Sequence, residues 1–143
     1  MLNAIFFYRI SRWLYLHQIP FLPKLVTLLI FLMYNCKIPY QARIGRGTKF
    51  GYGGIGVVIH KETVVGENCM IEQHVTIGGG NSHYPGVPRI GNNVHVSHGA
   101  IVFGGIIIGN NVEIGANAVV NKPVPDNAIV AGVPAKILRI KDV

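Results

Sequence analysis

A six-residue repeat runs through most of this 143-residue chain and constrains its fold more than any other feature. Large apolar residues recur at every sixth position, except for two longer steps, from 50 to 59 and from 77 to 90, that each contain an insertion. The members of this first column are Ile38, Ile44, Phe50, Ile59, Val65, Ile71, Ile77, Ile90, Val96, Val102, Ile108, Ile114 and Val120. An α-helix would need a period of about 3.6, and a hairpin protein would not keep a six-residue step for so long. The repeat therefore predicts a parallel β-helix of about four coils.

A second column of mostly small or β-branched residues lies four positions after the first and supports the same fold. Its members are Ala42, Thr48, Thr63, Cys69, Val75, Val94, Ala100, Ile106, Val112 and Ala118. Glycine often follows the first column, and all 18 glycines come after residue 38. A large inward residue, a turn-forming residue and a second inward residue describe one short strand and one tight turn.

The chain before this repeat has a different character and predicts a pair of helices. The range Leu2–His17 places Phe6, Ile10, Trp13 and Leu14 at helical spacing on one side, and Leu22–Asn35 is apolar nearly all round. A helix that is apolar all round is either buried or in contact with a membrane. The longest strongly apolar run has ten residues, whereas a membrane-spanning helix needs about 20, so we expect no transmembrane pass.

These patterns divide the chain into two parts. We expect a helical segment at 1–36 and a β-helix domain at 37–143, the latter with an inserted loop at 79–89 and a closing segment near its end. Because Cys36 and Cys69 lie far apart without metal-ligand spacing, we expect reduced thiols in a cytoplasmic protein and no metal site. No secretory signal is evident at the start of the sequence.

Charge is distributed unevenly along the chain. The formal net charge is +7, and residues 1–61 contain no acidic residue. We expect Arg9, Arg12 and Lys24 to lie where the helices pack in an oligomer and to touch an anionic membrane face. The basic residues are spread out and form no recognisable binding module, so we expect no nucleic-acid partner.

The repeat resembles that of the hexapeptide-repeat acyltransferases, whose fold is a left-handed β-helix shaped as a three-sided prism. The stretches Gly56–Ile59, Val75–Gly79 and Ala131–Lys136 are similar to serine acetyltransferases, and Ala131–Lys136 looks like the family's closing segment. The chain also looks like the small acetyltransferases of bacterial polysaccharide clusters. This resemblance implies a homotrimer that binds acetyl-CoA in the groove between neighbouring prisms.

Transfer of an acetyl group to a hydroxyl requires a base, donors for the oxyanion and a slot for a thiol-bearing cofactor. His60 follows Ile59 at a corner of the predicted prism, and one coil later comes Gly78, where the loop that carries His83 begins. We therefore expect His60 and His83 to converge on one catalytic corner, where either of them could serve as the base. Backbone N–H groups near Gly78 and Gly79 are the expected oxyanion donors.

The repeat aligns a second set of polar residues. Tyr52, Gln73 and His98 each lie two residues after the first column, so they line either the substrate edge of a groove or an ordinary polar edge. His95 and His74 have no such partners and are expected at the surface.

The binding of acetyl-CoA is implied by the resemblance alone. In such proteins the pantetheine chain passes small residues whose backbone groups bind its amides. The positions similar to these are Gly78, Gly79, Gly99, Ala100, Ala116 and Ala118, with Lys136 available for the nucleotide phosphates.

One departure from serine acetyltransferases bears on the acceptor. Their catalytic histidine lies in the turn before the Gly-Ile-Val-Val stretch and pairs with an aspartate one coil below. Here Tyr52 stands near the expected histidine and Lys37 near the expected aspartate. We therefore expect an O-acetyltransferase that acts on a sugar hydroxyl of a surface polysaccharide or its precursor. Serine O-acetylation and amino-sugar N-acetylation are the enzymatic alternatives, and an inactive trimeric scaffold is the non-enzymatic one.

Overall fold

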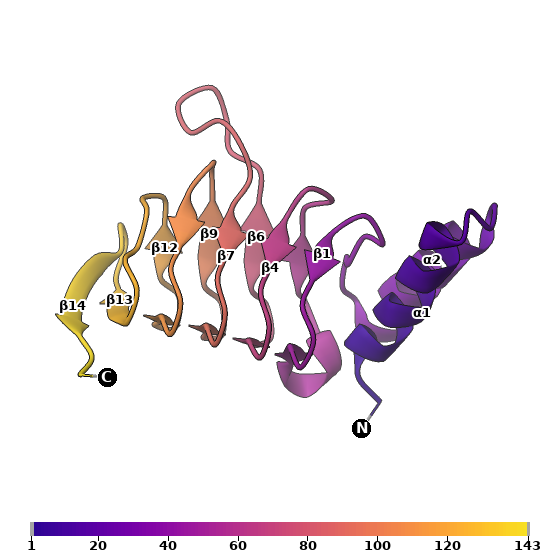
Figure 1. Ribbon diagram of the computed structural model, residues 1–143, viewed down its shortest axis with the longest axis horizontal. Coiled ribbons are helices and arrows are strands. Elements are labelled where there is room, and N and C mark those ends of the chain that lie inside the picture. Colours follow the sequence, from indigo (N-terminus) through magenta and orange to yellow (C-terminus); the bar gives the residue numbers. More distant parts are fainter. Residues whose placement is uncertain (1, 143) are drawn as a thin grey trace.

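The computed structural model, which describes residues 2–142, consists of a helix pair followed by a prism of short strands (Figure 1). The helices are α1 (Ala4–Leu16) and α2 (Leu22–Tyr34), close to their predicted ranges. The strands are β1 (Arg43–Ile44), β2 (Lys49–Phe50), β3 (Val58–Ile59), β4 (Val64–Val65), β5 (Met70–Ile71), β6 (Thr76–Gly78), β7 (Arg89–Ile90), β8 (His95–Val96), β9 (Ile101–Phe103), β10 (Ile107–Ile108), β11 (Glu113–Ile114), β12 (Val119–Val120), β13 (Ala128–Ala131) and β14 (Lys136–Ile140).

Three parallel sheets form the sides of the prism. The first side is β1-β4-β7-β10, the second is β2-β5-β8-β11-β13, and the third is β3-β6-β9-β12. Strand β14 pairs antiparallel with β13 and ends the second side. Each coil contributes one strand to each side, which gives four complete coils wound as a left-handed β-helix. The predicted fold class is thus confirmed.

The two columns that the sequence predicts form most of the core. Every residue of both columns is buried, with at most 7% of its surface exposed. Because each coil repeats the same local environment, the same kind of residue is stable at the same place in every coil. Both cysteines are free and buried, and burial raises the pKa of the Cys36 thiol to about 12.

The two insertions leave the prism at different corners. The first forms a short 3-10 turn, η1 (Gly51–Gly54), in which Tyr52 has a left-handed φ of 49°. The second forms a loop that stands out from the prism between β6 and β7 (Figure 1). Tyr84 of this loop packs edge-on against Phe103 of β9, with the ring centroids 5.4 Å apart.

Helix α1 covers the open edge of the first coil. The Tyr8 hydroxyl donates to the Ala42 carbonyl and accepts from the Ile44 N–H. The Arg9 guanidinium donates to the carbonyls of Ile44 and Gly45. These side chains satisfy backbone groups that a terminal strand would otherwise leave unpaired.

The helix pair leaves much of its apolar surface uncovered. The side of α1 with Phe6, Ile10 and Trp13 is exposed, and the buried residues of this helix are Ala4, Tyr8 and Ser11. Helix α2 exposes a larger apolar set, Leu22, Leu25, Leu28, Leu29, Phe31, Leu32 and Met33. Within residues 2–142, no helix is long and apolar enough to cross a membrane.

The basic residues of α1 bond this helix to the chain of the first coil, and their contact with a membrane stays a prediction. Arg9 is bonded to the first coil as described above, and the Arg12 guanidinium lies 3.0 Å from the Tyr40 carbonyl and 3.3 Å from that of Gln41. Only Lys24, on α2, is exposed as expected.

Candidate active site

The turns that join the second side of the prism to the third bring together the predicted Tyr52, Gln73 and His98. We call this edge the Tyr52 corner. Its groove has a volume of about 520 Å³, and its lining residues are Gly51, Tyr52, Met70, Glu72, Gln73, His95 and His98. The predicted alignment of the three polar residues is therefore present, and their binding of substrate stays a prediction.

Glu72 connects two histidines in this groove. Its Oε1 lies 2.7 Å from Nε2 of His95, and its Oε2 lies 3.0 Å from Nδ1 of His98. The backbone N–H of His98 also donates to Oε2, at 3.0 Å. The hydrogen bonds from His95 and then His98 hold the pKa of the Glu72 carboxyl below its ordinary value. Glu72 is thus an ionised acceptor that fixes both imidazole rings.

Neither Glu72 nor the partnership of His95 was found from the sequence. His95 points outward because the next residue, Val96, belongs to the inward column, and its strand pairs with that of Met70. Glu72 follows the inward Ile71 at the start of the corner one coil below. The same alignment that placed Gln73 beside His98 also places Glu72 there, so the signal was present in the repeat.

His60 lies at a different edge, where the third side turns into the first side of the next coil. We call this edge the His60 corner. Its groove, of about 330 Å³, is lined by Lys37, Pro39, Val58, Ile59, His60, Lys61, Ile77 and Gly78. The His60 ring packs beside Gly79, where a Cβ would lie 3.4 Å from its Cδ2 atom. His60 therefore lies at the root of the inserted loop, as the sequence predicted.

A backbone hydrogen bond fixes the proton on the His60 ring. The N–H of Glu62 donates to Nδ1 of His60 at 3.1 Å. A neutral imidazole that accepts at Nδ1 carries its hydrogen on Nε2. The Nε2 nitrogen of His60 is consequently a hydrogen-bond donor.

His83 is held within its own loop. Its Nδ1 lies 3.2 Å from the Ser82 hydroxyl, and its backbone N–H donates to Oδ1 of Asn81 at 2.9 Å. The loop leans on the following coil, because the Gly105 N–H donates to the Pro85 carbonyl at 2.8 Å. No hydrogen bond joins His83 to His60 among the described residues, so their convergence on one catalytic centre stays a prediction.

The residues predicted to bind acetyl-CoA are divided between the two corners. Gly78 and Gly79 lie at the His60 corner, and Gly99 and Ala116 at the Tyr52 corner. Lys136 is exposed on β14. Gly99 is required by the fold itself, because it has a φ of +72° and a Cβ there would lie 2.0 Å from Oδ1 of Asn117.

Ala100 and Ala118 do not offer a surface to a cofactor. Both side chains are completely buried in the prism. Their backbone groups are also engaged: the N–H groups donate to Ser97 and Gly115, and the carbonyls accept from Thr76 and Ile101. We therefore leave these two residues out of the candidate site.

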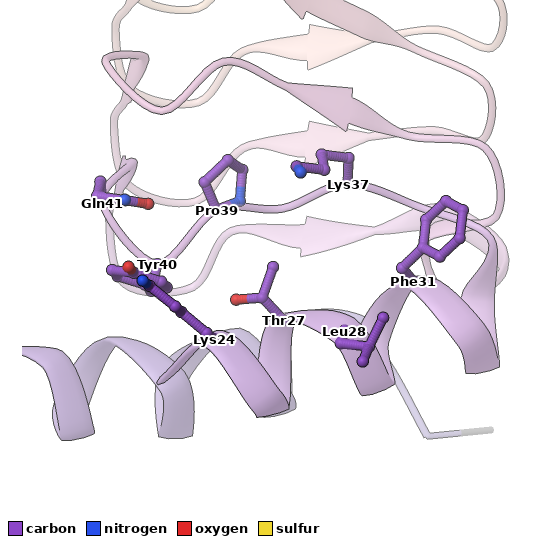
Figure 2. A pocket seen from close by; sticks show the side chains of 8 residues that line it. All are labelled: Lys24, Thr27, Leu28, Phe31, Lys37, Pro39, Tyr40 and Gln41. Carbon is purple, nitrogen blue, oxygen red and sulfur yellow. The ribbon is translucent and has the colours of Figure 1, made fainter. Parts of the chain in front are cut away.

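A cavity between α2 and the chain that leads into β1 adjoins the His60 corner (Figure 2). Its volume is about 420 Å³, and it is lined by Lys24, Thr27, Leu28, Phe31, Lys37, Pro39, Tyr40 and Gln41. Lys37 and Pro39 line this cavity and also the His60 groove, so the two hollows are neighbours. The side chains that α2 contributes to the cavity include Leu28 and Phe31, and Lys24 and Lys37 are among its lining residues.

Known proteins with similar sequences include several serine acetyltransferases. The chain is 40% identical over 137 residues to the serine acetyltransferase of Synechococcus elongatus, covering 95% of this chain and 56% of that protein. It is 34% identical over 142 residues to the serine acetyltransferase of Helicobacter pylori strain J99, covering 96% of this chain and 80% of that protein. A comparison with protein-family models found no match.

Solved structures give the same result. Serine acetyltransferase from Brucella abortus in complex with coenzyme A superimposes with a TM-score of 0.89 at 33% identity, covering 97% of this chain and 56% of that one. The chain thus spans little more than half the length of the Synechococcus and Brucella proteins that it matches.

Proposed function

Because this chain belongs to the serine acetyltransferase family of hexapeptide-repeat proteins, we propose that it transfers an acetyl group from acetyl-CoA to a sugar hydroxyl of a bacterial surface polysaccharide or its precursor. The similar sequences support the acetyltransferase activity. The coenzyme A complex of the Brucella protein supports acetyl-CoA as the donor.

The composition of the Tyr52 groove is the observation that favours a sugar as the acceptor. Tyr52 is 69% exposed and offers a flat aromatic surface, while Gln73 offers amide donors and acceptors for hydroxyl groups. Among the described residues that line this groove there is no lysine or arginine, which a free amino acid would need for its carboxylate. An uncharged polyhydroxylated acceptor fits these groups better.

The separation of the two corners supports a homotrimer. The Tyr52 corner and the His60 corner of one subunit lie on opposite edges of the third side of the prism. They can contribute to one active site only if the His60 corner of one subunit faces the Tyr52 corner of its neighbour. In a closed ring of three prisms each interface would hold one such groove, with acetyl-CoA along it.

The residues of the His60 corner have complementary roles in this arrangement. His60 presents its Nε2–H, Gly78 lines the groove, and Gly79 lies beside the His60 ring, so we expect His60 and the backbone N–H groups near these glycines to stabilise the oxyanion of the tetrahedral intermediate. His83, carried on the protruding loop, would reach the acceptor across the interface. Ala116 and Lys136 remain available for acetyl-CoA.

Serine is the second candidate acceptor because the matched relatives are named serine acetyltransferases. The family's histidine–aspartate pair is replaced here by Tyr52 and Lys37, which is why serine ranks second. A lysine or arginine that binds the serine carboxylate would have to come from the neighbouring subunit.

The acceptor is tested by following thiol release from acetyl-CoA with a panel of free sugars, nucleotide sugars, amino sugars and serine. We expect release with a hydroxyl-bearing sugar, and an acetyl ester in the product by mass spectrometry. Turnover of serine alone would establish the second candidate. An amide product would establish N-acetylation. If none of the acceptors gave thiol release, the protein would be an inactive scaffold.

The exposed apolar surface of the helix pair supports a peripheral position at the inner face of the membrane, on a protein that is otherwise cytoplasmic. Phe21 is 83% exposed and Leu32 67%, and Lys24 supplies positive charge close by. We expect the protein to sediment with anionic vesicles and less with neutral ones. If the protein stays in the supernatant with both kinds of vesicle, the exposed apolar surface of the helices serves only for packing within the oligomer.

A further inference from the structure

We propose that His98 is the general base of the acetyl transfer and that Glu72 positions it. This assignment rests on the proposed function and replaces the two histidines that the sequence favoured. It gives this chain a histidine–carboxylate pair. The pair lies at a different place from the histidine–aspartate pair of serine acetyltransferases, near whose expected positions Tyr52 and Lys37 stand here. The pair joins two successive coils at the Tyr52 corner.

The hydrogen bonds determine which nitrogen of His98 can accept a proton. An ionised carboxylate is only an acceptor, so Nδ1 of His98, 3.0 Å from Oε2 of Glu72, must carry the hydrogen. A neutral imidazole has one N–H, which leaves the lone pair on Nε2. The opposite holds for His60, whose Nε2 nitrogen is protonated because its Nδ1 accepts from Glu62. His98 therefore has the tautomer of a base, and His60 that of a donor.

The position of His98 suits a general base better than the position of His95 does. Both rings are bound to Glu72, with side chains 55% and 45% exposed. His98 is bound through Nδ1, so its free nitrogen is the distal one and faces away from the backbone. His95 is bound through Nε2, so its free nitrogen is next to its own main chain. His95 holds the second oxygen of Glu72 and thereby restrains the carboxylate.

Nε2 of His98 removes the proton from the acceptor hydroxyl while the acceptor oxygen forms a bond to the thioester carbonyl carbon. The electron pair of the carbonyl moves to its oxygen, which the donors of the His60 corner stabilise. Collapse of this intermediate breaks the carbon–sulfur bond, and the His98 imidazolium returns the proton to the leaving thiolate.

Several titratable groups surround this pair. Those on the elements packed around His98 are Tyr52 on η1, Lys49 on β2, Glu72 after β5, His95 on β8 and Glu113 on β11. Of these, Glu72 alone is hydrogen-bonded to the His98 ring. The pH dependence of the rate should therefore respond to Glu72 most strongly.

The substitution His98→Asn tests the base. Asparagine keeps an N–H for Glu72 but lacks Nε2, so kcat with acetyl-CoA and the sugar acceptor should fall by about 10²- to 10⁴-fold with little change in KM for acetyl-CoA. The matched control is His74→Asn on the same corner: His74 has a φ of +59°, which asparagine adopts readily. A His98→Asn enzyme with full activity would overturn the assignment.

The substitution Glu72→Gln tests the positioning. Loss of the carboxylate makes the imidazolium less favourable, so kcat should fall less than in His98→Asn and the acid limb of the kcat/KM profile should move to lower pH. A merely structural role would lower activity without moving that limb, and an unmoved limb would overturn the role of Glu72.

A measurement on the resting protein separates this inference from the proposed function. Long-range ¹H–¹⁵N spectra of the histidine rings should show the Nδ1–H tautomer for His98 and the Nε2–H tautomer for His60. An Nε2–H tautomer at His98 would overturn the assignment of the base even in an active enzyme. Conversely, a wild-type protein with the expected tautomers and no acetyl transfer to any acceptor would refute the proposed function.

Discussion

The hydroxyl of Tyr8 accepts a hydrogen bond from the backbone N–H of Ile44 at 3.2 Å, so a helix side chain completes the bonding of the first strand of the prism. The same hydroxyl donates to the Ala42 carbonyl, and the Tyr8 side chain is completely buried. The helix pair and the prism thus share one hydrophobic core. The base of the molecule, and with it Lys37 beside the His60 groove, depends on this junction.

Replacing Tyr8 with phenylalanine should therefore destabilise the protein without creating a cavity. The change leaves a buried N–H and a buried carbonyl without partners, which costs about 1–3 kcal/mol. Urea unfolding of Tyr8→Phe against the wild type measures this cost. Tyr15→Phe, whose side chain is 45% exposed, is the matched control. Equal stability of all three proteins would show that the hydroxyl does not support the first coil.

The stabilisation that Glu72 provides should depend on pH. Because its folded pKa lies below the ordinary value, its hydrogen bonds to His95 and His98 stabilise the fold above about pH 4.3, and this contribution is lost as the pH falls through the folded pKa. The difference in unfolding free energy between wild type and Glu72→Gln should thus be larger at pH 7 than at pH 3. A difference that is constant with pH would contradict an ionised Glu72 in the folded state.

His60 should act as a hydrogen-bond donor. His60→Ala removes the Nε2–H and should lower kcat by about 10²- to 10³-fold, as the loss of an oxyanion donor does. His60→Gln places an amide N–H near the same point and should recover much of that loss. The comparison of the two kcat values is the measurement, with His17→Gln on the exposed end of α1 as the control. If glutamine were as poor as alanine and the acid limb of the rate profile disappeared, His60 would be the base.

The fold was predictable because its code is local and repeated. Ile71, Val96 and Ile114 occupy equivalent places in successive coils, so the same inward position recurs many times along the sequence. The helices were also predictable, but the buried side of α1 was not. Phe6 and Tyr8 are both compatible with a buried face, and Tyr8 is the one that is buried because its hydroxyl bonds to the edge of the first strand.

The site was predictable only in part, because it depends on relations between coils. Tyr52, Gln73 and His98 were aligned correctly, whereas the bonds of Glu72 to His95 and His98 depend on side-chain directions that a repeat does not specify. The repeat itself places Ala100 in the inward column, and its burial argues against contact with a cofactor. The proposed facing of two corners across subunits depends on contacts between chains, which a repeat within one chain does not specify.

The most direct test of the account mixes two inactive variants. His60→Ala and His98→Asn chains, carrying different tags, are coexpressed and the mixed assemblies are purified through both tags. Each purified mixed trimer holds two chains of one kind and one of the other. If each active groove takes its His60 corner from one subunit and its Tyr52 corner from the next, one of the three grooves of the mixed trimer is intact, which restores about a third of the wild-type sites. Acetyl transfer to the sugar acceptor should accordingly rise to that order. Activity that stays at the level of the two variants alone would contradict a groove shared between subunits.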